Sequence, residues 1–260
     1  MGVKGCQRYC WSHRRSCAVS KFSILRQIII ASMVVLHSGT TGRGAVDDTA
    51  LDRRRRHDML RQQVLARGVR NARVIRAMAR IPRHLFLEPA QRSQAYSDQA
   101  LPVAEQQTIS QPLIVAVMTE ALEVQAGHRI LEVGTGTGYQ TAILALLAGR
   151  VYTLERFAAL SREAQSRLHA LGLDNVEYRI ADGTLGWPEQ SPFERIIVTA
   201  GAPEVPEPLW NQLAEGGRLV IPLGDRHSQT LKKIARRNGR RWEVDVLPCR
   251  FVPLVGLHGW

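Results

Sequence analysis

Cysteine is scarce in this sequence of 260 residues. The chain has four cysteines, of which three lie among the first 17 residues and the fourth, Cys249, stands alone near the other end. Disulfide frameworks and zinc sites need several cysteines, or cysteines with histidines, at short spacings. After residue 17 the sequence therefore excludes both, which fits a reducing compartment or indifference to redox conditions.

Long apolar runs and early acidic residues are also missing. The apolar segment Ile28 to Leu36 has nine residues, whereas a membrane-spanning helix needs about 20. Residues 1–46 hold seven basic residues and no acid, so they carry +7 of the formal net charge of +12. Residues 47–260 then hold 28 basic against 23 acidic residues, or +5. That excess is too small to indicate nucleic-acid binding by itself.

We interpret residues 1–46 as a leader outside the fold. A basic start with Arg14-Arg15, a short apolar run and small polar residues are typical of signal peptides and weak anchors. A start codon assigned too early, with Met33 or Met59 as the true first residue, is an equal alternative. All three interpretations stay open on the sequence.

The remainder predicts one α/β domain. Five apolar runs recur about twenty residues apart, with helical patterns between them, which is typical of a Rossmann-like, doubly wound, mostly parallel sheet. The predicted strands are 129–133, 150–154, 176–180, 195–199 and 218–222, and the predicted helices are 140–147, 158–171 and 206–213. We expect a domain at 47–260, divided into a helical and substrate-loop region (47–126), a cofactor-binding sheet (127–225) and a hairpin with a tail (226–260).

Turn residues refine this outline. Thr230 to Leu247 alternates around Asn238-Gly239, a strong hairpin signal. Asn before Gly also offers little steric barrier to succinimide formation, so an exposed turn here would form isoaspartate in the protein itself. Before the sheet, Leu51 to Arg80 predicts two helices separated by Gly68, with Asn71 capping the second.

The thirty residues between Pro82 and Pro112 show little periodicity, which favours a functional loop. The loop ends at Thr108-Ile109-Ser110, directly before a helix predicted over 111–122. Ser110 could simply cap this helix. The exposed N–H groups of a helix start, together with the Ser110 hydroxyl, could also receive a carboxylate.

The stretch Ile130 to Tyr139, I-L-E-V-G-T-G-T-G-Y, reads as a strand, a glycine turn and a helix start. Glu155, at the end of the next strand, is placed to accept hydrogen bonds from ribose hydroxyls. We interpret the pattern as an adenosine site. Glu132 beside the turn would repel a pyrophosphate but suits the ammonium and sulfonium of S-adenosylmethionine, which favours the methyl donor over NAD. A glycine turn without a ligand is the remaining alternative.

Asp182-Gly183 follows the third strand of the sheet. Its carboxylate would reach an adenine at the carboxyl edge of the sheet. A simple Asp-Gly turn explains the pair equally well.

Taken together, these motifs resemble the protein-L-isoaspartate O-methyltransferase family across about Arg53 to Leu254. The most specific match runs from Ala95-Tyr96-Ser97-Asp98 through Leu101-Pro102 to the hallmark Gln107-Thr108-Ile109-Ser110-Gln111-Pro112 before the glycine turn. Further matches lie at 81–86, 199–203, 216–222 and 251–254. The chain departs from the family at Ala104 and Gln106, since members commonly carry glycine shortly before the hallmark.

The resemblance implies that the enzyme transfers a methyl group from S-adenosyl-L-methionine to the free α-carboxylate of L-isoaspartyl residues in damaged proteins, leaving S-adenosyl-L-homocysteine. It implies Ser110 as the catalytic residue and Thr108, Ile109 and Ser110 as substrate-binding residues. The implied cofactor contacts are Gly134, Thr135, Gly136 and Gly138 to the methionine part, Glu155 to the ribose, and Asp182 with Gly183 to the adenine. No metal is expected.

The resemblance also bears on location and partners. We expect a cytoplasmic monomer whose partners are isoaspartyl proteins and peptides and not nucleic acid, because the methyl donor is made in the cytosol. Export to the periplasm, or tethering to a membrane with contact to the export machinery, is the alternative if residues 1–46 act as a signal or anchor.

Other functions remain open on the sequence. A methyltransferase for nucleic-acid amines would place an amide or carboxylate acceptor after the fourth strand, where this chain has Thr199-Ala200-Gly201. A membrane-tethered binding module without a cofactor would be supported only by the basic leader. A dehydrogenase would bind NAD, against which Glu132 argues.

Overall fold

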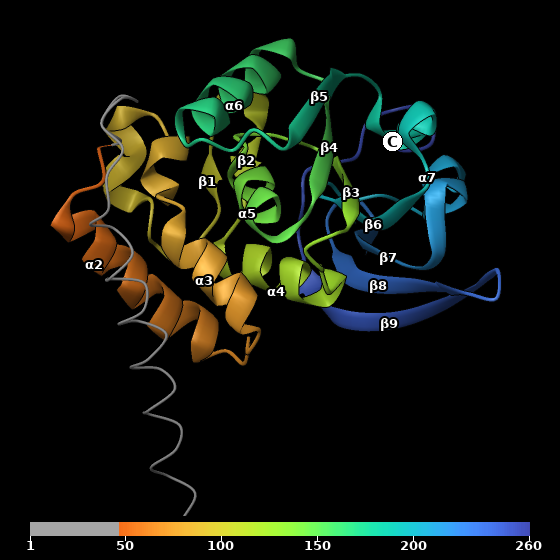
Figure 1. Ribbon diagram of the computed structural model, residues 1–260, viewed down its shortest axis with the longest axis horizontal. Coiled ribbons are helices and arrows are strands. Elements are labelled where there is room, and N and C mark those ends of the chain that lie inside the picture. The colour runs from red at the N-terminus through yellow and green to blue at the C-terminus, as the bar shows by residue number, and fades with distance from the viewer. Residues whose placement is uncertain (1–46) are drawn as a thin grey trace, which may run out of the picture. The chain divides into compact units, whose positions relative to one another are not determined.

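The computed structural model describes residues 47–260 (Figure 1), so the predictions about residues 1–46 lie outside the described residues. Within 47–260, no helix combines the length and the apolar character that crossing a membrane requires.

A seven-stranded sheet organises this part of the chain. Its order is β5-β4-β3-β6-β7-β8-β9, with parallel pairing from β5 to β7 and antiparallel pairing from β7 to β9. The strands are β3 (Arg129–Val133), β4 (Arg150–Glu155), β5 (Val176–Ile180), β6 (Phe193–Val198), β7 (Leu213–Gly224), β8 (Gln229–Arg237) and β9 (Arg240–Cys249). The five predicted parallel strands and the hairpin are confirmed, although β7 starts five residues before the predicted strand. The predicted fold class is likewise confirmed.

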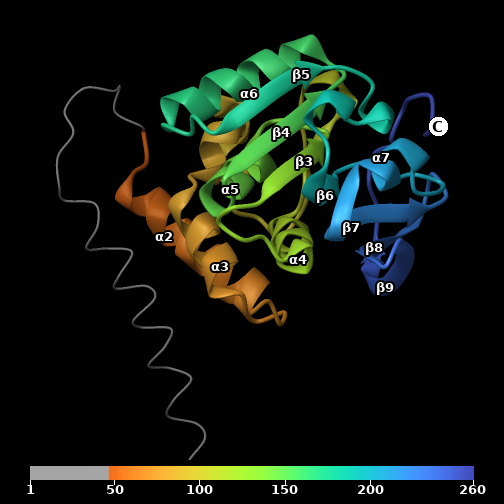
Figure 2. The same ribbon diagram turned by 45° about the vertical axis from the view of Figure 1, so that its right-hand side comes forward.

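Helices cover both faces of the parallel part of the sheet, where β3, β4 and β6 bury side chains on both sides. Ile130 packs into the core cluster that also contains residues of α4, α5 and α6, whereas its neighbour Leu131 packs into a second cluster with α7. Figure 2 shows α5 and α6 beside the parallel strands and the β8–β9 hairpin at the far edge. The helices are α4 (Pro112–Leu122), α5 (Tyr139–Leu147), α6 (Ala158–Ala170) and α7 (Glu207–Gln212).

The N-terminal helices agree with the sequence pattern. The Asn71 side chain accepts hydrogen bonds from the N–H groups of Arg73 and Val74, as a capping residue should. The elements are α2 (Ala50–Met59), a π-helical turn η2 (Leu60–Leu65) and α3 (Ala72–Arg80). They pack Val64, Val74 and Met78 into the first core cluster.

The predicted irregular loop consists of short turns and one two-residue ladder, in which Leu101 pairs with Ile109. The elements are η3 (Arg83–Phe86), η4 (Pro89–Gln94), β1 (Leu101–Pro102), η5 (Ala104–Gln106) and β2 (Thr108–Ile109). Glu105 and Gln106 have φ angles of 57° and 56°. Such left-handed conformations favour glycine, which the segment 101–112 lacks. The ladder delivers Ser110 to the start of α4.

Candidate active site

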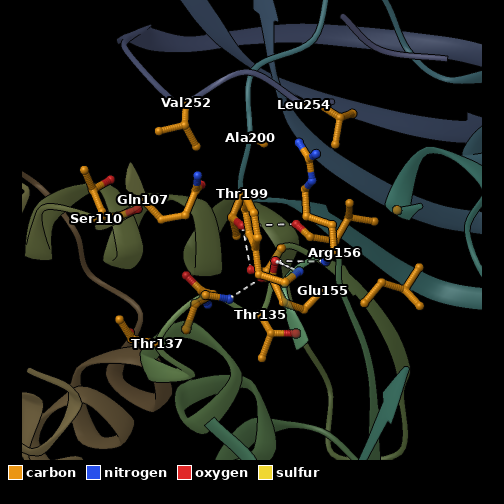
Figure 3. A pocket seen from close by; sticks show the side chains of 18 of the residues that line it. Gln107, Ser110, Thr135, Thr137, Glu155, Arg156, Thr199, Ala200, Val252 and Leu254 are labelled. Atoms are coloured by element: carbon orange, nitrogen blue, oxygen red, sulfur yellow. Dashed lines mark hydrogen bonds between the residues drawn. The ribbon is translucent and has the colours of Figure 1, made fainter. Parts of the chain in front are cut away.

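A cleft opens at the carboxyl ends of β3, β4 and β6, where ligands bind in open α/β sheets. Its volume is about 930 Å³, including space open to solvent. Figure 3 shows Ser110 and Gln107 on one side of it, Val252 and Leu254 on another, and the glycine turn with Glu155 facing them. Segments far apart in the sequence therefore meet in one cleft.

The glycine turn passes so close to the Thr199 side chain that Gly134 has no room for a side chain of its own. Gly134 has a φ of 95°, and a Cβ added there would lie 2.3 Å from the Thr199 hydroxyl oxygen. That hydroxyl donates to the carbonyl of Gly134 at 2.7 Å and so fixes the turn against β6. Gly136, with a φ of 54°, faces open space. The cradle can therefore admit a ligand directly against the backbone.

Gly138 serves a different purpose. It begins α5 with a φ of 89°, and an added Cβ would lie 2.7 Å from a methyl carbon of Leu168 in α6. Gly138 does not line the cleft, whereas Gly134, Thr135 and Gly136 do. The structure assigns it to helix packing, and its predicted contact to a cofactor stays a prediction.

Glu155 lies where the sequence predicts it, at the end of β4 and in the wall of the cleft. One carboxylate oxygen accepts the N–H of Gly136 at 2.8 Å, and the other accepts those of Arg156 and Phe157. An ionised carboxylate has about four acceptor positions. The side chain is thus held in place and keeps capacity for a hydroxyl in the cleft.

Glu132 does not behave as the sequence analysis assumed. Its side chain is fully buried beneath the turn and does not line the cleft. One carboxylate oxygen accepts the hydroxyls of Thr141 and Thr153, both at 2.6 Å, while the other has no partner among the described residues. Burial raises the pKa of Glu132 to about 7, although the two hydroxyls act in the opposite direction. Direct contact with a cofactor ammonium would require rearrangement.

Asp182 is turned away from the cleft. Its carboxylate accepts the N–H and hydroxyl of Thr184 and, at 2.8 Å, the N–H of Leu257 in the C-terminal tail. Burial opposes the charge, but these hydrogen bonds outweigh it and lower the pKa of Asp182. Gly183 does line the cleft, and a Cβ there would lie 2.4 Å from a methyl group of Val133. Of this predicted pair, only Gly183 is brought to the site.

Ser110 lines the cleft, but its predicted capping role is wrong. The N-cap of α4 is Gln111, without a side-chain cap, and Pro112 follows in the first turn as expected. The Ser110 hydroxyl makes no hydrogen bond to any residue in the range 47–260. It stands beside the helix start with its donor and acceptor available. Thr108 and Ile109, also predicted, line the cleft as well.

Sequence reasoning missed the wall made by the C-terminal tail. Val252 to Val255 line the cleft. The tail is held there because Gly201 donates its N–H to Val252 at 2.8 Å and accepts that of Leu254 at 2.7 Å. The Phe-Val-Pro-Leu match marked this segment, but nothing in its residue types indicated a position at the site. Arg156 and Phe157, which also line the cleft, follow Glu155 directly and were equally unassigned.

One cluster outside the cleft has the composition of a metal site. Ligand atoms of Asp48, Asp52 and His84 lie within 4.8 Å of one another. However, both ring nitrogens of His84 are hydrogen-bonded, to the Tyr96 hydroxyl and a backbone carbonyl, and Asp48 forms an ion pair with Arg56. Hydrogen bonds and an ion pair within the chain therefore explain why these side chains lie together, without a metal ion.

The chain is similar to known proteins over most of its length. A family model described as protein-L-isoaspartate(D-aspartate) O-methyltransferase matches residues 54–259. A protein-L-isoaspartate O-methyltransferase of Syntrophotalea carbinolica is 54% identical over 203 residues, which cover 78% of this chain and 94% of that protein. One of Geobacter metallireducens is 53% identical over 206 residues, covering 79% and 95%.

Solved structures of proteins with the same family description are also similar to this chain. A structure of a protein-L-isoaspartate O-methyltransferase superposes with a TM-score of 0.70 at 31% identity, covering 78% of this chain and 67% of the other. A Plasmodium falciparum protein, described as a putative member in complex with S-adenosyl-L-homocysteine, gives a TM-score of 0.67 at 25% identity, covering 76% and 96%.

Proposed function

Because the chain belongs to the protein-L-isoaspartate(D-aspartate) O-methyltransferase family, we propose that it methylates the free α-carboxylate of L-isoaspartyl residues in damaged proteins and so initiates their repair. The observation that carries the proposal is one cleft in which the glycine turn and Glu155 face Ser110 at the start of α4.

The cleft fits S-adenosylmethionine. The tight cradle at Gly134, the open space at Gly136 and the carboxylate of Glu155 match a methionine part and a ribose, respectively. For the adenine edge, we propose that Gly183 makes the contact, while Asp182 holds the backbone there through its bonds to Thr184 and the tail. When bound, the cofactor supplies a methyl group on a positively charged sulfur.

Proton transfer has no evident part in the reaction. Among residues 47–260, the only formally charged side chains that line the cleft are Glu155 and Arg156, and Glu155 already accepts three backbone N–H groups. An isoaspartyl α-carboxylate is ionised near neutral pH, so it needs no general base. Catalysis then rests on position and on exclusion of water.

Ser110 provides the position. Its hydroxyl, which has no hydrogen-bond partner within 47–260, and the N–H groups of the first turn of α4 after Pro112, which no side chain caps, are the donors that we assign to the carboxylate. The apolar side chains of Val252 and Leu254 close the cleft opposite and limit water there. We propose that this set aims one carboxylate oxygen at the methyl carbon.

Replacement of Ser110 by alanine tests this role. We expect kcat to fall by roughly 10- to 100-fold, because a small misplacement of the nucleophile is costly, while affinity for S-adenosylhomocysteine stays within about threefold. The assay compares two peptides that differ only in isoaspartate or aspartate at one position. An unchanged kcat would remove Ser110 from the mechanism, and methylation of neither peptide by wild-type protein that binds the cofactor would end the substrate assignment.

We further propose that the enzyme works as a monomer in the cytoplasm and uses no metal. The cytoplasm is supported by the supply of the methyl donor, which is made there. The absence of a metal is supported by the carboxylate nucleophile, because no water or hydroxyl needs activation.

A further inference from the structure

The turn of the β8–β9 hairpin carries a chemically reactive pair on its surface. Asn238 and Gly239 are both exposed, with φ angles of 51° and 70°. Two positive φ angles suit the tight turn that joins strands of this twist. Because glycine has no side chain to shield its nitrogen, an exposed Asn-Gly pair can close to a succinimide.

The reaction has a defined course. The backbone nitrogen of Gly239 loses its proton and bonds to Cγ of Asn238, and the bond from Cγ to the side-chain nitrogen breaks, so that ammonia leaves with that proton. Water then opens the five-membered ring. Attack on the α-carbonyl leaves isoaspartate at 238, and attack on the side-chain carbonyl leaves aspartate.

Glu215, on the neighbouring strand β7, engages both backbone nitrogens of this turn. Its carboxylate accepts the N–H of Asn238 through one oxygen and that of Gly239 through the other, the latter at 3.1 Å. Arg236 lies 3.7 Å from the second oxygen and helps to orient the carboxylate. The nucleophilic nitrogen of succinimide formation is therefore tied to a negative charge.

That contact opposes the reaction in two ways. A carboxylate that accepts an N–H stabilises the protonated nitrogen, and its charge disfavours the anion that must attack. Both turn amides are also held toward β7, which resists the rotation that would bring the nitrogen to Cγ. We propose that Asn238 is this enzyme's own site of isoaspartate formation, that Glu215 holds the site in check, and that a second copy of the enzyme methylates the isoaspartate once it forms.

Methylation must come from a second copy because the turn is remote from its own cleft. The opposite end of the hairpin is the end near the cleft, since Gln229 there accepts the N–H of Phe251 beside Val252. The nine residues of β8 separate the two ends, which corresponds to roughly 30 Å. Figure 1 shows the turn at the outer end of the hairpin. This last part rests on the proposed function, whereas control by Glu215 does not.

The test compares the full chain with the Glu215→Ala and Glu207→Ala variants. Glu207 is a matched control, because it pairs with Arg241 on the same hairpin without touching the turn amides. The proteins are incubated at neutral pH without a methyl donor, digested after glutamate so that residue 238 stays inside a peptide, and analysed for isoaspartate by mass spectrometry. We expect conversion in Glu215→Ala roughly tenfold faster than in the other two proteins. Circular dichroism before incubation shows whether each variant is folded.

Equal rates in all three folded proteins would overturn control by Glu215. If Glu215→Ala does not fold, Glu215→Gln keeps acceptor capacity without the charge and should convert at an intermediate rate. A Gln variant as slow as wild type would then contradict the role of the charge.

In a second step, fresh wild-type enzyme and labelled S-adenosylmethionine are added to aged Glu215→Ala. Label at residue 238, at a rate that rises with fresh enzyme, supports transfer between copies. Transfer between copies is overturned if the labelling rate does not depend on the amount of fresh enzyme. It is also overturned if residue 238 takes up no label while the same enzyme methylates a free isoaspartyl peptide. Failure to methylate that free peptide would count against the proposed function instead.

Discussion

At the scale of single residues, Glu132 is the side chain whose environment departs most from what its position in the motif suggests. It is fully buried, and Thr153, which donates to its carboxylate, accepts the hydroxyl of Thr135 at 2.6 Å. Thr135 lines the cleft, so a chain of hydroxyls connects the buried carboxylate to the glycine turn. Besides these hydroxyls, the charged or titratable groups that face Glu132 are Glu155 and Tyr178.

The raised pKa of Glu132 predicts a specific pH dependence of stability. An acid whose pKa rises from 4.5 to about 7 on folding binds its proton more tightly in the folded state, so its ionisation reduces stability as pH rises through that window. Glu132→Gln removes this loss. We expect the variant to gain on the order of 3 kcal/mol relative to wild type between pH 5 and pH 8.

Urea unfolding of both proteins at the two pH values measures this difference. A stability difference that does not change with pH would show that Glu132 keeps an ordinary pKa in the folded protein.

Gln106 is strained, because it adopts a left-handed conformation that favours glycine. Its φ of 56° costs a residue with a side chain about 1–2 kcal/mol. We expect Gln106→Gly to stabilise the protein by about 0.5–1 kcal/mol, after the greater entropy loss of glycine is counted. Ala104→Gly, at a position without a positive φ, should destabilise it. The denaturation midpoints of both variants and of wild type measure these differences. A loss of stability in Gln106→Gly would show that Gln106 is not strained.

At the scale of elements, periodicity in the sequence was sufficient for the sheet. The bounds predicted for 129–133 and 176–180 agree with the structure. The first run is largely apolar, as a buried parallel strand needs to be, whereas 176–180 is a partly exposed edge strand that its spacing from the other runs predicted. Side-chain partners were not predictable in this way. The carboxylate of Asp182 is taken by Leu257, 75 residues away, and only the path of the tail decides that contact. Likewise, Ser110 is not the N-cap of α4, because the helix begins one residue later than predicted and Gln111 occupies the N-cap position.

The C-terminal tail is an element whose attachment can be tested. Gly256 passes so close to Asp182 that an added Cβ would lie 2.0 Å from the carboxylate. Gly256→Ala should push the tail away and displace the wall that Val252 and Leu254 form. We expect KM for an isoaspartyl peptide to rise about five- to tenfold, as for a loss of roughly 1–1.4 kcal/mol of binding.

Gly127→Ala is the matched control, because nothing lies within 4 Å of an added Cβ there. Steady-state kinetics with varied peptide measure the effect. A KM equal to that of the control would mean that the tail does not shape the substrate site.

At the scale of the whole molecule, charge and chemistry are distributed unequally along the chain. Residues 1–46 carry +7 of the net charge of +12, whereas the family match begins at residue 54. We therefore expect folding and methyl transfer to depend on the residues after 46.

Deletion of residues 1–46 tests this separation. We expect residues 47–260 to keep kcat/KM for an isoaspartyl peptide within about twofold of the full chain, because the family match lies entirely within them and twofold corresponds to only about 0.4 kcal/mol. Thr49 caps α2 through its bond from Asp52, so the shortened chain still begins with a closed helix end. Base-labile methyl incorporation into matched isoaspartyl and aspartyl peptides is the measurement. A large loss of activity in a shortened protein with an unchanged unfolding midpoint would show that the leader contributes to the site itself, because a mere loss of stability would move that midpoint.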